Sequence, residues 1–159
     1  MYFVPETAKG SSATMKEVNI YLYTTIRGTR AKRGAYCYVL EMNTAKGPAT
    51  LTNSEQVEEM TAHRAELTAF VAALKRILKS SRLTVYTDSH YLAVNTMDCL
   101  ASWKKNGWKN AKGLPVKHKE EWQEVYELIR KHGFKFEVSS VHSYYQWMKK
   151  EAEAVVECT

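Results

Sequence analysis

The period of the hydrophobic pattern changes from two to about 3.6 partway along the chain, and this change restricts the folds that the chain can adopt. Residues 18–26, VNIYLYTTI, and residues 35–42, AYCYVLEM, alternate β-branched, aromatic and polar side chains. They predict two strands of a hairpin, joined by the basic turn RGTRAKRG. A third short strand is predicted near PATLTN, residues 48–53. The first third of the chain is therefore expected to form antiparallel strands.

From about Thr61 the apolar residues recur at steps of three and four, which predicts a long amphipathic helix that ends in KSS, residues 79–81. LTVYT, residues 83–87, predicts a buried strand, and Asp88 and Ser89 are good residues to begin the helix that follows. The remaining predicted elements are an amphipathic helix at 120–132, a strand at 134–141 and a terminal helix near 147–157. The order is βββαβααβα, in which the helix between the third and fourth strands supplies a crossover.

The length and the apolar content of the chain predict one compact domain. The chain has 159 residues, of which 45% are hydrophobic, and this is enough for a single core. The segment KGSSAT before the first strand suggests a loose lead-in. We therefore expect a short lead-in over residues 1–17 and one domain over residues 18–159.

Net charge and cysteine content indicate which kind of partner and which cellular compartment to expect. The formal net charge of +6 favours a polyanionic partner such as nucleic acid. Cys37, Cys99 and Cys158 form neither a CxxC pair nor a Cys/His cluster, which argues against a disulfide framework and against a structural zinc site. No apolar run approaches the roughly 20 residues needed to cross a bilayer. We expect no membrane association, and a reducing compartment, the cytoplasm, as the location.

Several short motifs, in this order of elements, resemble ribonuclease H of type 1. They are HRAEL at 63–67, VYTDSHY at 85–91, WKKNGWKNAKGLPVKHKEEW at 103–122, and the last strand followed by His142. The resemblance covers nearly everything from Val18 to about Val156. It implies an α/β fold of the RNase H type, with a five-stranded mixed sheet, three antiparallel N-terminal strands and flanking helices.

The resemblance also implies a chemistry, which is hydrolysis of the RNA strand of an RNA/DNA hybrid by two Mg²⁺ or Mn²⁺ ions held by four carboxylates. Hard ions of this kind prefer oxygen ligands. Glu66 and Asp88 match two of the four acids. Without the resemblance, Glu66 would be interpreted as an exposed helix glutamate and Asp88 as a helix N-cap.

The other two acids of the family pattern are missing from this sequence. Alignment of the first strand places Tyr23 where the family has its first aspartate. Near the C-terminus, His142 matches the family's loop histidine, and a segment about three residues shorter places Lys149 where the last aspartate belongs. Glu151 and Glu153 are close by but are expected on other helix faces. Glu66, Asp88 and His142 are therefore predicted to be remnants of a catalytic site.

The electrostatic repulsion between two metal ions shows how the loss of two acids affects metal binding. Two doubly charged ions about 4 Å apart repel by about 16 kcal/mol at an effective dielectric constant of about 20. Four carboxylates would neutralise the two ions, whereas Glu66 and Asp88 leave them uncompensated and a lysine adds to the repulsion. The sequence thus predicts at most one weakly held Mg²⁺ or Mn²⁺ ion on Glu66 and Asp88.

The basic segment with two tryptophans matches the family's handle, whose lysines contact phosphates. We call residues 103–112 the basic handle; its matching residues are Trp103, Lys104, Lys105, Trp108, Lys109 and Lys112. Phosphate contacts give affinity without sequence choice. The tryptophans are expected to serve mainly in packing and the lysines mainly in contact; the alternative is that the lysines are only solvated.

His63 and His90 occupy positions where the family carries amide side chains that touch the substrate, and a histidine can also donate or accept a hydrogen bond. Each could equally be an ordinary surface histidine. The preferred hypothesis is a ribonuclease H-like domain that binds an RNA/DNA hybrid or a related duplex and has lost most of its hydrolysis. The alternatives are an active ribonuclease H with substituted ligands, and a scaffold comparable to the connection domains of reverse transcriptases.

Overall fold

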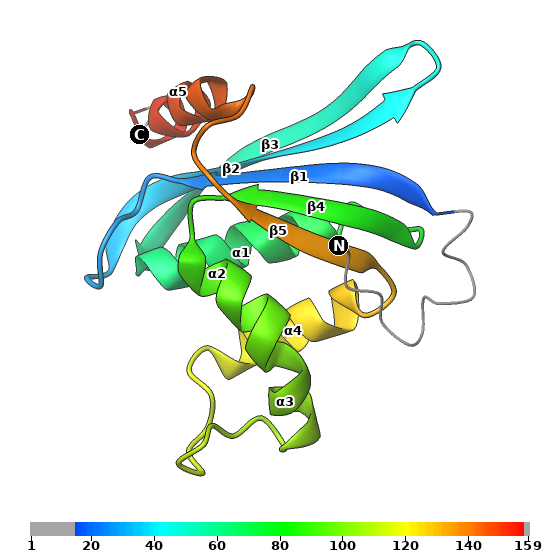
Figure 1. Ribbon diagram of the computed structural model, residues 1–159. Helices are drawn as coiled ribbons and strands as arrows, with labels where there is room; N and C mark the ends of the chain where they lie inside the picture. Colours follow the sequence, from blue (N-terminus) through cyan, green and yellow to red (C-terminus); the bar gives the residue numbers. More distant parts are fainter. Residues whose placement is uncertain (1–14, 158–159) are drawn as a thin grey trace.

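Five strands form one mixed sheet in the order β3-β2-β1-β4-β5 (Figure 1). The computed structural model describes residues 15–157. β1 pairs antiparallel with β2 and parallel with β4; β2 pairs antiparallel with β3, and β4 pairs parallel with β5. The strands are β1 (Lys16–Thr24), β2 (Lys32–Thr44), β3 (Gly47–Met60), β4 (Ser81–Thr87) and β5 (Gly133–Val138). The predicted five-stranded sheet and the order βββαβααβα are confirmed.

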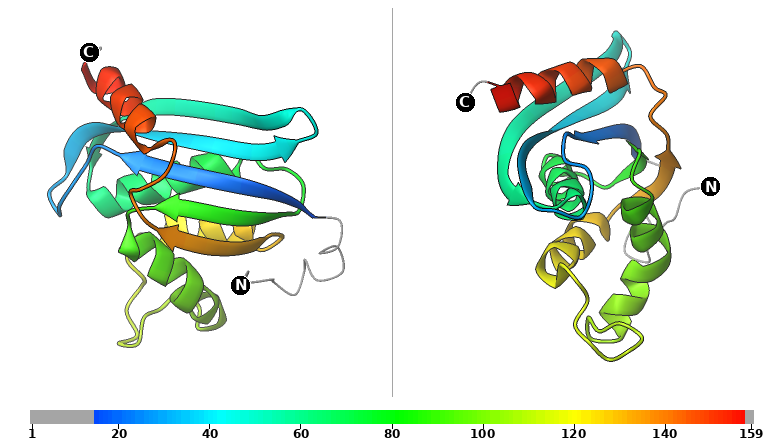
Figure 2. Two further views of the ribbon diagram at one scale, coloured as in Figure 1. Left: turned by 45° about the horizontal axis from the view of Figure 1, so that its top comes forward. Right: turned by 90° about the vertical axis from the view of Figure 1, so that its left-hand side faces the viewer.

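The helices cover both faces of this sheet (Figure 2). Helices α1 (Ala62–Leu74) and α4 (Lys119–Ile129) pack together on one face, and α5 (Tyr145–Glu157) packs on β1, β2 and β3 from the other face. Between β4 and α4, the chain forms one long helical stretch that leads away from the sheet. It consists of α2 (His90–Val94), the π-helical turn η2 (Asn95–Cys99) and α3 (Leu100–Lys105).

Alternation along β1 creates a separate core on each face of the sheet. Val18, Ile20 and Leu22 point into the larger core, which contains α1 and α4. Tyr21 and Tyr23 point the other way and belong to a smaller core beneath α5. Burial on both faces is the expected state of a strand with parallel and antiparallel neighbours at the centre of a covered sheet.

Two element boundaries differ from the predictions. α1 ends at Leu74 instead of continuing to residues 79–81, because the chain turns there to enter β4 at Ser81. The backbone N–H groups of Arg76 and Ile77 donate to carbonyls only three residues back, Ile77 turns into the core, and Leu78 is 80% exposed. β3 is also much longer than the predicted strand at 48–53, since it pairs with nearly all of β2.

Three further predictions concern the lead-in, the cysteines and membrane segments. Of the predicted lead-in, residues 1–14 lie outside the described residues, and β1 begins at Lys16 instead of Val18. Cys37 and Cys99 are free thiols, and Cys158 lies outside the described range. Within residues 15–157, no helix combines the length and apolar composition needed to cross a membrane.

His132 is a fully buried titratable residue at the end of the sheet where β4 and β5 begin. Its Nδ1 accepts a hydrogen bond of 3.0 Å from the backbone N–H of Ser81, and its side chain is fully buried. Burial, with Lys131 adding to the effect, lowers the pKa of His132 to about 4. Because Nδ1 accepts a hydrogen bond, the neutral ring carries its proton on Nε2.

We expect the protein to lose stability as the pH falls from about 6.5 to about 4, because the unfolded chain binds a proton at His132 before the folded chain does. The loss from this residue should be on the order of 2–3 kcal/mol in the free energy of unfolding. Urea denaturation at several pH values would measure it. In His132→Asn, which retains an acceptor for the Ser81 N–H, this part of the pH dependence should vanish; an unchanged pH profile would contradict the assignment.

Candidate functional site

The parallel pairing of β1 and β4 brings their carboxyl ends to one edge of the sheet. The register pairs Tyr21 with Tyr86, and its continuation by two residues places Tyr23 beside Asp88. The start of α1 reaches the same edge, where the Ala62 N–H donates to the carbonyl of Gly28 in the β1–β2 loop. The three elements thus converge on one site, which we call the acid cluster: Tyr23, Arg27, Glu66 and Asp88.

Glu66 is held at this edge by α1 and Ser89. Thr61 caps α1 by accepting a hydrogen bond from the Arg64 N–H, and Ala65 and Leu67 on either side of Glu66 are fully buried. The Ser89 hydroxyl donates to Glu66 Oε1 at 2.6 Å and also caps α2 by accepting from the Leu92 N–H. Burial raises the pKa of Glu66, and the neighbouring charge of Asp88 raises it further. Glu66 is therefore not an exposed helix glutamate.

Asp88 forms an ion pair with a residue that the sequence motifs did not indicate. Arg27 Nη2 lies 3.3 Å from Asp88 Oδ2, and the Arg27 guanidinium lies over the Tyr23 ring, 5.3 Å from its centroid. Asp88 is also not the N-cap of α2, since Ser89 caps that helix. Its carboxylate instead faces the cluster and is partly open to solvent.

Tyr23 is a packed core residue at the position where the family pattern has an acid. It is 7% exposed, and its ring meets that of Tyr145 of α5 edge to face, with centroids 5.4 Å apart. The recess between Tyr23, Glu66 and Asp88 has a volume of only about 10 Å³. That is room for about one water molecule.

The residues of α5 do not add a carboxylate to the cluster. Lys149 is exposed, and Glu153 is exposed as well. Glu151 is half-buried beside Cys37 of β2, where its charge contributes to the raised pKa of that thiol, after burial itself. Within residues 15–157, no three histidine, cysteine, aspartate or glutamate side chains are grouped so that they could hold a metal ion.

His142 lies among tyrosines in the segment that joins β5 to α5. Its ring centroid is 4.7 Å from that of Tyr21, 6.0 Å from that of Tyr86 and 5.8 Å from that of Tyr145. Its Nδ1 accepts a hydrogen bond from the Tyr144 N–H. Burial lowers the pKa of His142, although the charge of Asp88 acts in the opposite direction. The charge of Asp88 thus acts on the pKa of His142.

The basic handle protrudes beyond the helices, at the end of the α2–α3 stretch that begins next to Asp88 (Figure 1). Trp103 packs edge to face on Trp122, and Trp108 packs in the same manner on Tyr126. The Lys104 ammonium lies over the Tyr126 ring, at 5.6 Å from its centroid. Lys104, Lys105, Lys109 and Lys112 are all exposed. The tryptophans therefore pack, as expected, and the lysines are available for contact.

The two candidate histidines are both exposed but have different neighbours. His63 stacks on Tyr91 with ring centroids 3.7 Å apart, and burial lowers its pKa, with Lys117 adding to the effect. His90 is exposed at the start of α2. The family pattern gave no reason to single out Lys117, an exposed cation close to His63. Arg27 was missed for a similar reason, since the basic run RGTRAKRG does not indicate which arginine turns toward Asp88.

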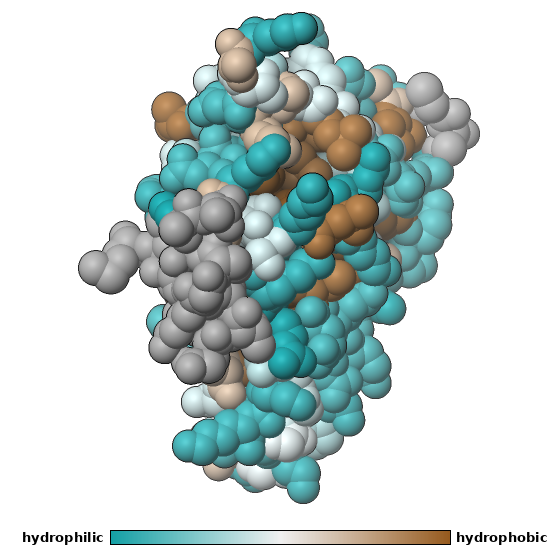
Figure 3. Space-filling view, turned by 90° about the vertical axis from the view of Figure 1, so that its right-hand side faces the viewer, coloured by the Kyte–Doolittle hydropathy of each residue, from teal (hydrophilic) through white to brown (hydrophobic). Residues whose placement is uncertain are grey.

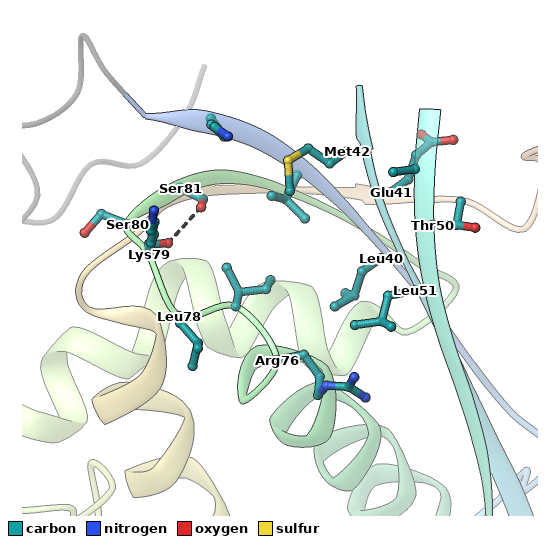
Figure 4. A pocket seen from close by; sticks show the side chains of 14 residues that line it. Leu40, Glu41, Met42, Thr50, Leu51, Arg76, Leu78, Lys79, Ser80 and Ser81 are labelled. Carbon is teal, nitrogen blue, oxygen red and sulfur yellow. Dashed lines mark hydrogen bonds between the residues drawn. The ribbon is translucent and has the colours of Figure 1, made fainter. Parts of the chain in front are cut away.

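A cavity also lies away from the acid cluster, between the β2–β3 hairpin and the segment that follows α1. It has a volume of about 560 Å³, and apolar side chains gather on this face of the molecule between hydrophilic ones (Figure 3). Leu40, Leu51 and Leu78 are among its lining residues (Figure 4). The carboxylate of Glu41 is turned away from it and accepts hydrogen bonds from Asn19, Tyr21 and Tyr144. None of the predicted site residues lines this cavity.

Comparisons with known proteins agree with the fold and the motifs. Residues 15–151 match the family model described as RNase H. The chain is 36% identical over 133 residues to Ribonuclease H of Clostridium botulinum, covering 81% of this chain and 86% of that protein. It is also similar to Ribonuclease H of Caldicellulosiruptor saccharolyticus, with 36% identity over 134 residues and the same coverage.

Solved structures show the same fold at lower sequence identity. LC9-RNase H1, a type 1 RNase H with the type 2 active-site motif, superposes with a TM-score of 0.73 at 16% identity, over 91% of this chain and 74% of that one. The foamy viral protease-reverse transcriptase in complex with an RNA/DNA hybrid has a TM-score of 0.68 at 22% identity, over 91% of this chain and 20% of that one. These similarities establish the α/β RNase H-like fold.

We predict that Glu66→Gln stabilises the protein at neutral pH. Because the pKa of Glu66 is raised in the folded state, ionising this side chain opposes folding. The penalty grows as the pH rises above the ordinary glutamate pKa and is absent at acid pH. The gain should be at most about 1 kcal/mol, and the glutamine can still accept the hydrogen bond from Ser89. Thermal melts of both proteins at neutral and acid pH would test this; a variant that is less stable at neutral pH would contradict it.

Proposed function

Since the chain belongs to the RNase H family, we propose that it binds nucleic acid, with an RNA/DNA hybrid as the first candidate. We further propose that its metal-dependent hydrolysis is lost or severely weakened. The acid cluster carries this proposal, because a guanidinium and a buried phenol accompany two carboxylates at the edge of the sheet.

Binding is supported by the basic handle and by its connection to the acid cluster. Its four lysines are exposed, and the packed tryptophans beneath them fix the backbone that carries them. Asn110 holds the turn, since its side-chain oxygen accepts hydrogen bonds from the backbone N–H groups of Lys112 and Leu114. A group of exposed cations on an anchored backbone suits contact with backbone phosphates and reads no sequence.

Weakened hydrolysis is supported by the donor set of the acid cluster. Members of the RNase H family typically use Mg²⁺, which requires oxygen ligands in near-octahedral geometry. Here Asp88 is paired with Arg27, Glu66 is bound by Ser89, and the Tyr23 side chain is packed under α5. The residues present do not fit a pair of divalent ions, whose mutual repulsion of about 16 kcal/mol two carboxylates cannot offset.

The second candidate function is hydrolysis of the RNA strand of a hybrid by a ribonuclease H with substituted ligands. Two observations favour it. The proteins that are 36% identical to this chain over 81% of its length are named Ribonuclease H. Glu66 and Asp88 also come together at the site edge, as an active member would require. The relatives support this candidate, and the donor set supports the first.

For binding, we predict that the triple substitution Lys105→Gln, Lys109→Gln and Lys112→Gln lowers the affinity for an RNA/DNA hybrid about tenfold or more at low salt. The slope of log affinity against log salt should fall by about two to three, roughly one for each lost phosphate contact. Fluorescence anisotropy with a labelled hybrid would measure both.

A matched control removes the same charge from the opposite end of the molecule. Lys16, Lys46 and Lys79 are exposed near the β2–β3 hairpin and the segment after α1. Their triple substitution to Gln should leave the salt slope nearly unchanged. Equal losses in the two triple variants would mean that net charge, and not the basic handle, provides the affinity.

For hydrolysis, we predict that a labelled hybrid is not cleaved above background in the presence of magnesium or manganese. The measurement is gel analysis of the RNA strand with wild-type protein, Glu66→Gln and Asp88→Asn prepared in parallel. Cleavage by the wild type that disappears in either variant would establish the second candidate and overturn the proposed loss of hydrolysis. Cleavage that persists in both variants would indicate a contaminating nuclease.

A further inference from the structure

We propose that Arg27 is a resident cation of the acid cluster, through which this edge of the sheet binds a phosphodiester group without a divalent metal. The inference rests on the proposed nucleic-acid binding. It adds the chemical group that is bound, a phosphate oxygen, and the side chain that binds it.

The backbone on both sides of Arg27 is anchored. The preceding Ile26 is 1% exposed in the larger core, and the carbonyl of the following Gly28 accepts the Ala62 N–H at 3.3 Å. Across the loop, Gly34 approaches so closely that a Cβ there would lie 2.6 Å from the side chains of Thr25 and Ile26. The backbone of Arg27 is therefore held in place beside the other residues of the acid cluster.

The guanidinium has one side engaged and another side open. Nη2 is paired with Asp88 at 3.3 Å, and the guanidinium carbon lies over the Tyr23 ring. The side chain is nevertheless 49% exposed, which leaves it accessible to a ligand from solvent. A guanidinium offers five N–H donors in a planar fork, which matches the geometry of phosphate oxygens.

The charges around Arg27 explain why an arginine can take the place of metal ions here. Glu66 and Asp88 would repel a phosphate if they were alone. Arg27 offsets one of their charges, and its side chain remains accessible from solvent. The charges of Arg27 and Lys149 both act to lower the pKa of Tyr145, although burial and other neighbours raise it overall. A divalent ion at Asp88 would meet the guanidinium directly, so metal and Arg27 compete for the same carboxylate.

Three variants in one loop separate the specific role of Arg27 from its charge. Arg27→Gln removes the cation, Arg27→Lys retains the charge without the planar fork, and Arg30→Gln removes an equal charge from an exposed position nearby. Circular dichroism would establish that each variant is folded. The affinity for a labelled RNA/DNA hybrid is then measured by anisotropy at low salt, once with EDTA and once with magnesium.

We expect the wild type to bind equally well with EDTA and with magnesium. Arg27→Gln should lose about fivefold to tenfold in affinity and about one unit of salt slope, Arg27→Lys should lose less, and Arg30→Gln should change little. Equal effects of Arg27→Gln and Arg30→Gln would overturn the phosphate contact. So would a wild type that binds the hybrid only when magnesium is present.

A second measurement does not depend on nucleic acid. With manganese, the thermal midpoint of Arg27→Gln should rise, because Asp88 then has no guanidinium partner and can hold a metal ion together with Glu66. The midpoints of the wild type and Arg30→Gln should not rise. A wild type that manganese stabilises as much as it stabilises Arg27→Gln would refute the resident cation. If the wild type binds no hybrid at all, the proposed function fails, and this titration still decides whether Arg27 occupies the place of the metal.

Discussion

The parallel pairing of β1 with β4 is the interaction on which the candidate site depends. It aligns the carboxyl ends of the two strands and places Tyr23 beside Asp88, while the Ala62–Gly28 hydrogen bond brings the start of α1 to the same edge. A parallel pair requires a crossover, and α1 provides it on the face where Val18, Ile20 and Leu22 are buried. The core that stabilises the sheet therefore also determines which side chains meet at its edge.

Electrostatics at that edge follow from which face of β1 each residue occupies. Tyr23 points to the side of α5, and its packing against Tyr145 excludes water from a position where an acid would need solvent or metal. Glu66, on the opposite side, is held by Ser89 and has a raised pKa because of burial. Arg27 supplies positive charge between the two faces. Under the proposed function, packing on one face and ion pairing at the edge would act together against the accumulation of divalent ions.

The basic handle is built on a different principle from the acid cluster. Its tryptophan rings pack on α4, and its lysines remain exposed at the surface. Each phosphate contact of a lysine would add a small amount of affinity, and salt weakens such contacts. Because this surface needs neither a metal nor a buried charge, it can retain binding even when the acid cluster changes. Under the proposed function, the chain would therefore keep binding while losing hydrolysis.

The sequence by itself determined the order of elements through the change of hydrophobic period, and its resemblance to ribonuclease H implied the five-stranded sheet. Its motifs also indicated Glu66, Asp88 and the basic handle. It did not reveal where α1 ends, since the periodic residues Ile77 and Leu78 continue the helical pattern although only Ile77 enters the core. Nor could it identify Arg27 as the arginine of the basic loop that pairs with Asp88. Arg27 is in position because the backbone on either side of it is anchored, at Ile26 and at Gly28. Only the tertiary structure decided the ion pair between Arg27 and Asp88. Such a pair depends on the distance between two residues in space, and the spacing of residues along a loop does not encode that distance.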